Sequence, residues 1–204
     1  MTVIIDYGVG NLFSLSSSLR FLGAQTAVTS DPAVIAAADR ILLPGVGAFG
    51  DAMAKLEATG VIPVLNGQVA LGKPLLGICL GMQMLFAESL EYGHHKGLGY
   101  LPGCVCPLSE DLRGTALKVP HMGWNALDLV QPAHPLMKYT QAGDCVYFVH
   151  SYYAKDCDDS LIATAEYGVT VPAAVGSGCV MGTQFHPEKS GEVGLKILRA
   201  FLEL

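Results

Sequence analysis

Charged side chains are scarce in this chain of 204 residues, of which lysine, arginine, aspartate and glutamate make up only 15%. The formal net charge is −6 and no run of basic residues occurs, which argues against nucleic acid or an anionic membrane surface as a partner. No apolar run reaches the ~18 residues that a membrane span needs. Because 51% of the residues are hydrophobic, the chain can bury a core, and we expect a soluble globular protein.

Signals for export and for metal binding are also missing. The N-terminus has no basic segment and meets Asp6 after a short apolar stretch, so we expect a first strand instead of a signal peptide, and a cytoplasmic location. Six cysteines without an export signal are expected to stay reduced. Cys104 and Cys106 form C-x-C, not C-x-x-C, and the adjacent His94 and His95 would point in different directions. We therefore expect neither a bound metal nor a cofactor.

Strands and helices alternate in the first half of the chain. The expected strands are 3–6, 26–29, 40–43 and 75–78, the third of them stopped by Pro44 and Gly45. The expected helices run from 11 or 14 to 21, from about 32 to 38, and over about 50–58, 61–71 and 80–87. Strands that read as continuous apolar runs are covered on both faces, as in a parallel sheet with crossover helices.

After about residue 97 the chain is rich in short β segments separated by glycine and proline, a pattern typical of antiparallel strands. These segments are 103–106, 124–129, 146–150, 161–167, 171–175 and 180–185, and a final amphipathic helix is expected near 191–202. No repeat or linker interrupts the chain. We predict one α/β domain over residues 1–204, with a mixed, mostly parallel central sheet flanked by helices and an antiparallel β-rich second half.

Cys79 lies in Gly77-Ile78-Cys79-Leu80-Gly81, at the end of an apolar strand. The serine form of this pattern, G-x-S-x-G, is the nucleophile elbow of hydrolases, a strained strand-to-helix turn. Most cysteines in a chain with six are small buried hydrophobes, but a core cysteine has little need of flanking glycines. The positive end of the helix that begins at Leu80 would also favour a thiolate. We predict that Cys79 is a nucleophile for acyl transfer through a thioester.

A base for this thiol is expected in His186-Pro187-Glu188, which follows the last strand. In an extended chain, residues two apart lean to the same side, so Glu188 could reach Nδ1 of His186 and leave Nε2 free to take the thiol proton. Without Cys79, an exposed loop would be the simpler interpretation. His150 ends another strand and is a rival base, but no carboxylate stands beside it. Nucleophile, base and orienting acid together match a catalytic triad.

The segment Gly45-Val46-Gly47-Ala48-Phe49-Gly50 is a literal G-x-G-x-x-G, so a dinucleotide site has to be considered. Its context is poor, because Pro44 interrupts the passage from strand to turn and no acid follows about 20 residues later. The loop instead offers backbone N–H groups near Cys79, which could form an oxyanion hole with the N–H of Leu80. Polar side chains for a ligand are expected one turn after the elbow and at a strand end, namely Gln83, Ser151 and Tyr152.

Taken together, these motifs resemble those of the class I glutamine amidotransferases, over the whole length of the chain. The elbow 77–83 and the His186-Pro187-Glu188 element are the marks of that family. Within it, the chain is most similar to the glutaminase subunits of imidazole glycerol phosphate synthases. That narrower resemblance is carried by four segments in the same order: 6–11, 44–47, 120–125 and 186–190.

The resemblance implies a glutaminase without cofactor. Cys79 would attack the side-chain amide of glutamine, His186 would protonate the leaving ammonia, and Glu188 would orient His186. The oxyanion would be held by Gly45, Val46, Gly47 and Leu80. Glutamine would be positioned by Gln83, Ser151 and Tyr152.

The resemblance also implies a partner, a (β/α)8-barrel cyclase subunit that forms a heterodimer with the chain. The cyclase would use the ammonia to make imidazole glycerol phosphate and aminoimidazole carboxamide ribotide in histidine biosynthesis. The interface residues expected are Asn11, Trp124 and Lys189, Trp124 being the only tryptophan and a residue type favoured at interfaces.

Two other interpretations stay open. One is an amidotransferase subunit of another pathway, such as anthranilate or p-aminobenzoate synthesis, although those sequences generally lack the 120–125 element and the lysine after the triad glutamate. The other is a catalytically silent scaffold that only docks a partner, against which the intact triad argues.

Overall fold

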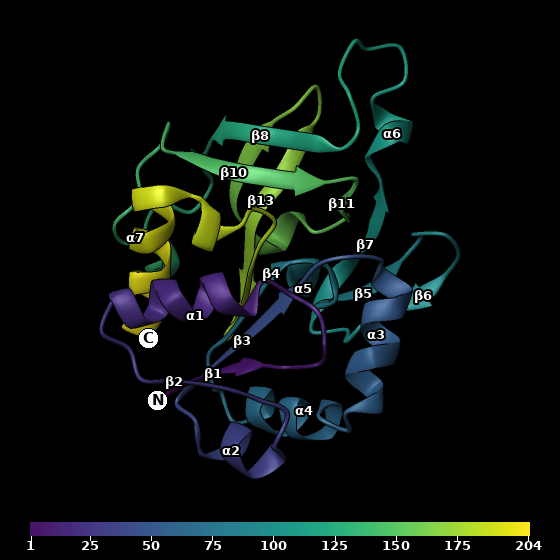
Figure 1. Cartoon of the computed structure of the whole chain (residues 1–204). Coiled ribbons are helices and arrows are strands. Elements are labelled where there is room, and N and C mark those ends of the chain that lie inside the picture. Colours follow the sequence, from purple (N-terminus) through teal and green to yellow (C-terminus); the bar gives the residue numbers. More distant parts are fainter.

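An eight-stranded sheet organises the chain, which is described here by a computed structural model of residues 1–204 (Figure 1). From edge to edge its strands are β2 (Thr26–Thr29), β1 (Thr2–Ile5), β3 (Arg40–Gly45), β4 (Leu75–Cys79), β14 (Val180–Thr183), β13 (Thr170–Ser177), β12 (Leu161–Glu166) and β9 (Asp128–Leu129). The first five pair in parallel, and β13, β12 and β9 extend the sheet in antiparallel fashion. The predicted mixed, mostly parallel sheet is confirmed.

Helices cover both faces of this sheet (Figure 1). Ile4 of β1 packs with α1 (Leu12–Phe21) and α7 (Gly191–Leu202). Its neighbours Val3 and Ile5 belong to the opposite core, with α2 (Pro32–Ala37), α3 (Phe49–Ala58) and α4 (Ile62–Ala70). Successive side chains of a strand point to opposite faces, which is why the parallel strands are apolar throughout. No helix in the structure combines the length and the apolarity needed to cross a membrane.

The second half of the chain adds two smaller sheets. An antiparallel ribbon consists of β8 (His121–Ala126) and β10 (Cys145–His150), and it lies beside β12 and α7. A four-stranded sheet has the order β11 (Tyr152–Lys155), β7 (Leu101–Pro107), β5 (Phe86–Ser89) and β6 (His95–Lys96). Short turns of helix complete the fold: α5 (Leu80–Gln83), α6 (Leu108–Asp111), η1 (Pro135–Met137), η2 (Asp158–Ser160) and η3 (Pro187–Lys189).

Several expected boundaries were wrong, including the following three. The helix expected over 80–87 ends at Gln83, because Phe86–Ser89 is instead strand β5, which pairs with β7. Strand β3 continues through Pro44 to Gly45, where it still pairs with β4. The strand expected over 124–129 begins at His121 and is broken at Leu127, whose buried side chain separates β8 from β9.

Candidate active site

Cys79 adopts the strained backbone expected of an elbow, with φ +54° and ψ −111°, a region that side-chain-bearing residues rarely occupy. The flanking glycines permit the close packing of α5 on the sheet. A Cβ at Gly81 would lie 1.8 Å from the carbonyl oxygen of Leu43, and one at Gly77 would lie 2.5 Å from the carbonyl oxygen of Gly81. No larger residue fits either position, and the thiol is therefore held at the carboxyl end of β4.

His186 and Glu188 form a buried pair beside this thiol. Nδ1 of His186 lies 2.9 Å from Oε1 of Glu188, and each side chain is only 2% exposed. The contact does not arise from an extended chain, as we had expected, because Pro187–Lys189 is a 3₁₀ turn. The hydroxyl of Ser190 fixes this turn by donating to the carbonyl of His186 at 2.7 Å.

The charges at this site favour a protonated His186. Burial lowers the pKa of His186, but the neighbouring Cys79 and Glu188 outweigh burial and raise the pKa to about 9. The second oxygen of Glu188 is buried without a hydrogen-bond partner, so the carboxylate is directed at the imidazole alone. An imidazolium beside a thiol is the arrangement that supports a sulfur nucleophile.

Cys79 and His186 open into one cavity of about 320 Å³. Most of the residues predicted from the sequence line it: Val46, Gly47, Leu80, Gln83, Ser151, Tyr152 and Lys189. Gly45 does not line the cavity, because it lies in β3 and packs against Gly81. The remaining lining residues are Glu91, Pro120, Val149 and His150.

The loop after β3 offers unpaired backbone donors to this cavity. The N–H groups of Val46 and Gly47 make no hydrogen bond within the protein, and Gly47 has φ +100°, a conformation that glycine tolerates best. Leu80 is the first residue of α5, so its N–H has no acceptor within that helix. Because α5 is a single turn, its dipole supports a thiolate less than the predicted longer helix would.

Gln83 is tied to the cavity wall through its amide nitrogen. Nε2 donates to the carbonyl of Tyr152 at 2.8 Å and to Oε1 of Gln184 at 3.0 Å, while Oε1 of Gln83 has no partner in the protein. The amide nitrogen of Gln184 in turn lies 3.8 Å from the sulfur of Cys79. Sequence reasoning missed Gln184, which no motif distinguishes from the rest of its strand end.

Glu91 is the carboxylate of the cavity wall that sequence reasoning also missed. It is 8% exposed, and one of its oxygens accepts the N–H of Phe49 at 2.6 Å, at the start of α3. Its other oxygen has no protein partner. Burial raises the pKa of Glu91. In the sequence, the feature that could have indicated Glu91 is its position between Leu90 and Tyr92 in a chain that has few charged residues.

His150, the rival base, has both ring nitrogens engaged. Nε2 lies 2.9 Å from Nδ1 of His121, and Nδ1 lies 2.9 Å from the carbonyl oxygen of Tyr152. Burial, followed by the charge of His121, lowers the pKa of His150 to about 3. No three His, Cys, Asp or Glu side chains in the chain lie close enough together to hold a metal ion.

The residues expected at a partner interface come from three segments that lie on or near η3. Trp124 is 56% exposed and meets Tyr147 edge-on at 6.0 Å, and its ring lies next to Gly191. Lys189 is exposed in η3, and α1, which begins after Asn11, packs beside η3. Of the three residues, Lys189 lines the cavity and the other two do not.

Comparison with known proteins places these features in a family. Residues 3–204 match the profile of the glutamine amidotransferase class-I family. The chain is 52% identical to the imidazole glycerol phosphate synthase subunit HisH of Syntrophotalea carbinolica, with 98% of each chain covered. It is 49% identical to the subunit of the same name from Methanothermobacter thermautotrophicus, covering 100% of this chain and 98% of that one.

Solved structures agree at the level of the fold. A crystal structure of a glutamine amidotransferase superimposes with a TM-score of 0.75 at 19% identity and covers 98% of this chain and 97% of its own. A structure of PurLQS from Thermotoga maritima gives a TM-score of 0.74 at 20% identity, with 99% and 97% covered.

Proposed function

The chain belongs to the class I glutamine amidotransferase family, and from this premise we propose that it is the glutaminase subunit of an imidazole glycerol phosphate synthase in histidine biosynthesis. The observation that carries the proposal is the convergence of a strained Cys79 and the buried His186–Glu188 pair on one cavity. The reaction is the hydrolysis of glutamine to glutamate and ammonia. We place it in the cytoplasm, where the six free cysteines would stay reduced.

The first half-reaction forms a thioester. The sulfur of Cys79 attacks the side-chain carbonyl carbon of glutamine, and the carbonyl oxygen becomes an oxyanion in a tetrahedral intermediate. When the intermediate collapses, the C–N bond breaks and His186 gives its proton to the nitrogen, which leaves as ammonia. The buried carboxylate of Glu188 keeps Nδ1 of His186 protonated, so that Nε2 is the nitrogen that exchanges protons with sulfur and substrate.

The second half-reaction releases glutamate. His186, now neutral, takes a proton from water, and the hydroxide attacks the γ-glutamyl thioester and returns the thiolate. Both tetrahedral intermediates need donors for the oxyanion, and the unpaired N–H groups of Val46 and Gly47, with that of Leu80, are the proposed set. Losing one such donor typically costs about 10²–10³ in rate. Gly45 contributes by its packing under the loop and not as a donor.

Glutamine also carries an α-ammonium and an α-carboxylate that the cavity has to recognise. We assign the α-ammonium to the free oxygens of Glu91 and Gln83, because a cationic donor needs acceptors and Glu91 is the carboxylate among the lining residues. Ser151 and Tyr152 complete the wall with polar groups. These assignments give the substrate a fixed direction, with its amide toward Cys79.

The proposed partner is a (β/α)8-barrel cyclase that receives the ammonia in a heterodimer, so that the complex acts as a lyase as well as a hydrolase. Free ammonia at neutral pH is mostly ammonium, which is not nucleophilic, so a sealed route favours its use. The proposed docking residues are Asn11, Trp124 and Lys189, of which Lys189 lines the cavity. The half-exposed indole of Trp124 is the expected anchor.

The test is glutamate release from glutamine, with and without the barrel cyclase and its nucleotide substrate. We expect Cys79→Ala to abolish glutamine use while the complex still makes product from added ammonia. The control is Cys145→Ala, which removes an exposed cysteine and should keep both activities. Loss of both activities in a folded Cys79→Ala complex would contradict the division of labour. Activity with an anthranilate or p-aminobenzoate synthase partner would instead favour one of those pathways. Both relatives compared above are named as subunits of imidazole glycerol phosphate synthase.

A further inference from the structure

A chain of side-chain hydrogen bonds connects the end of β12 to the wall of the cavity. Nδ2 of Asn125 donates to the carbonyl of Glu166 at 2.9 Å, and Oδ1 lies 3.0 Å from Nε2 of His121. Nδ1 of His121 lies 2.9 Å from Nε2 of His150, and Nδ1 of His150 lies 2.9 Å from the carbonyl oxygen of Tyr152. We call Asn125, His121 and His150 the relay.

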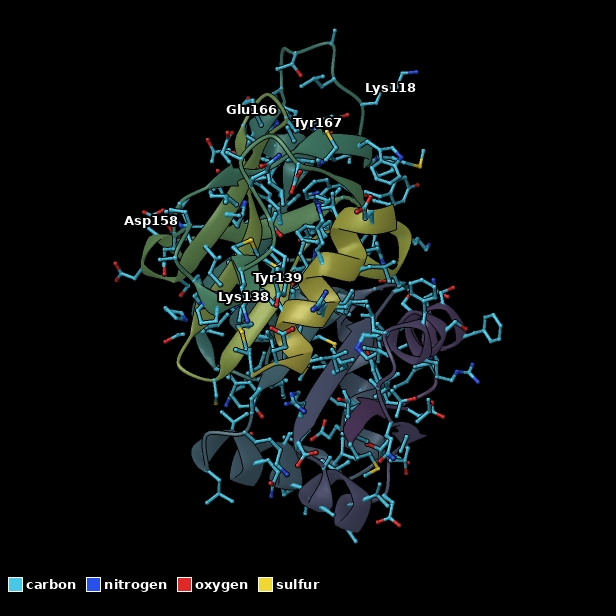
Figure 2. The ribbon with its side chains drawn as sticks, turned by 90° about the vertical axis from the view of Figure 1, so that its left-hand side faces the viewer. Lys118, Lys138, Tyr139, Asp158, Glu166 and Tyr167 are labelled. Carbon is cyan, nitrogen blue, oxygen red and sulfur yellow. The ribbon has the colours of Figure 1, made fainter.

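The relay is enclosed by aromatic rings. His121 is fully buried and stacks between Phe148, at 4.7 Å, and Tyr167, at 3.9 Å. Tyr167 is itself fixed by its hydroxyl, which donates to the carbonyl of Lys118 at 2.9 Å; Figure 2 labels both residues, with Glu166 beside Tyr167. Rings stacked this closely leave His121 no hydrogen-bond partners other than those of the relay.

Both imidazoles are neutral at physiological pH. Burial lowers the pKa of His121, and burial together with the charge of His121 lowers the pKa of His150 to about 3. The titratable groups that face the pair are His186 next to His150, whose charge acts in the same direction, and Tyr167 on His121. Glu91 and Lys189 line the cavity into which His150 opens.

The neutral relay is one hydrogen short. Four contacts have to be filled: Glu166 to Asn125, Asn125 to His121, His121 to His150, and His150 to Tyr152. Both ends of the chain are carbonyl oxygens, which only accept. The amide of Asn125 can donate toward one side only, and each neutral imidazole carries one N–H. Three hydrogens therefore serve four contacts.

The position of the gap follows from Asn125 and Gln83. Because Nδ2 of Asn125 donates to Glu166, its Oδ1 requires the hydrogen of His121 on Nε2. The single hydrogen of His150 can then fill only one of its two contacts, and we place it on Nε2, because the bare Nδ1 of His121 has no other donor whereas the carbonyl of Tyr152 already has one. The gap falls at the carbonyl of Tyr152, which still receives the hydrogen of Gln83 at 2.8 Å. We propose that His121 and His150 are positioning residues, which transmit the contact state of Asn125 to the Tyr152–Gln83 bond of the glutamine cavity by exchanging tautomers.

The tautomers of His121 and His150 would change when Asn125 no longer faces His121. Both imidazole hydrogens move to Nδ1, so that His121 donates to His150 and His150 donates to the carbonyl of Tyr152, and every remaining contact is filled. The carbonyl of Tyr152 then has two donors, and Gln83 holds it less firmly. Asn125 connects β8 to the end of β12. A movement of the β8–β10 ribbon against the main sheet would therefore change the hydrogen bond between Tyr152 and Gln83 at the cavity wall. That the cavity binds glutamine rests on the proposed function.

The test is the tautomer of His150, measured from imidazole ¹⁵N resonances of the full chain labelled at histidine. We expect Nε2–H on both rings in the wild type and Nδ1–H on His150 in Asn125→Ala. Asn125→Val, which favours a strand, should give the same change. Asn125→Asp keeps an acceptor oxygen toward His121 and should retain the wild-type tautomer. Glu166→Ala keeps its backbone carbonyl and is the matched control. An unchanged His150 in both Asn125→Ala and Asn125→Val, or Nδ1–H in the wild type, would overturn the proposal.

Kinetics of the complex with the cyclase supply the functional readout. Asn125→Ala should raise KM for glutamine about fivefold, the effect of one weakened hydrogen bond of about 1 kcal/mol, with a smaller change in kcat. Glu166→Ala should leave KM unchanged, and equal KM values in all variants would remove the proposed link to the cavity. If the wild-type complex fails to hydrolyse glutamine, the proposed function is contradicted. The tautomer measurement still shows whether His121 and His150 respond to Asn125.

Discussion

Replacing Glu188 by glutamine tests the charge at the centre of the proposed mechanism. The amide has nearly the same shape, and it removes only the negative charge that lies 2.9 Å from Nδ1 of His186. Both side chains are 2% exposed, so water cannot replace the lost interaction. Hydrogen bonds to charged groups contribute about 1.5–3 kcal/mol, which corresponds to a loss of about 10- to 150-fold in kcat/KM.

The substitution should also change the pH dependence. A carboxylate stabilises the imidazolium, so its removal lowers the pKa of His186 from about 9. We therefore expect the alkaline limb of kcat/KM to move to lower pH in Glu188→Gln. The contacts of His186 with Cys79 and Glu188 together stabilise the fold, because the folded pKa of His186 lies above the unfolded value of about 6.5. That contribution is complete below about pH 6.5 and is lost as the pH rises through about 9.

Glutamate release by the complex with the cyclase, followed from pH 6 to pH 10 in about one-unit steps, measures both effects. Glu192→Gln is the matched control, since Glu192 is exposed in the first turn of α7, and it should behave as the wild type. An alkaline limb that stays in place in Glu188→Gln, with kcat/KM within about twofold of the wild type, would refute the assigned role of the carboxylate.

Three further substitutions follow from the same geometry. Gly81→Ala places a methyl group 1.8 Å from the carbonyl oxygen of Leu43 and should destabilise the fold by about 4 kcal/mol or more in thermal unfolding; Gly67→Ala meets nothing within 4 Å, and an equal loss there would contradict the packing argument. Glu91→Gln should raise KM for glutamine about tenfold with little change in kcat, and an unchanged KM would remove Glu91 from the ammonium site. Trp124→Ala should weaken binding of the cyclase by about 2 kcal/mol in a titration, and a lowered melting temperature with unchanged affinity would return Trp124 to a structural role.

The parallel half of the fold could be predicted from local sequence, because its strands are apolar runs bounded by glycine and proline. The elbow around Cys79 could also be predicted from its two flanking glycines. The structure gives the steric reason, because a Cβ at Gly77 or Gly81 would clash with neighbouring backbone atoms. The family followed from a few motifs, and the matches at about 50% identity agree with it.

Features built by distant residues could not be predicted in this way. Helix α5 stops after one turn because the following residues, Phe86–Ser89, pair with the distant strand β7, and no local signal marks that pairing. Glu91 lines the cavity from a turn after β5, and the buried Gln184 contacts Gln83 and Cys79 from the end of β14, and no local pattern identifies either role. The pairing of His121 with His150 depends on the register between β8 and β10. The sequence of neither strand alone specifies that register.

The position of β14 has a consequence for when the enzyme can first work. This strand is among the last made, yet it inserts between β4 and β13, and His186 follows directly after it. A growing polypeptide on the ribosome therefore has its thiol long before it has its imidazole, and the central sheet stays split until the final segment joins. Premature amide cleavage is thus prevented by topology, and chains truncated before β14 should be inert toward glutamine however much of their remaining structure they form.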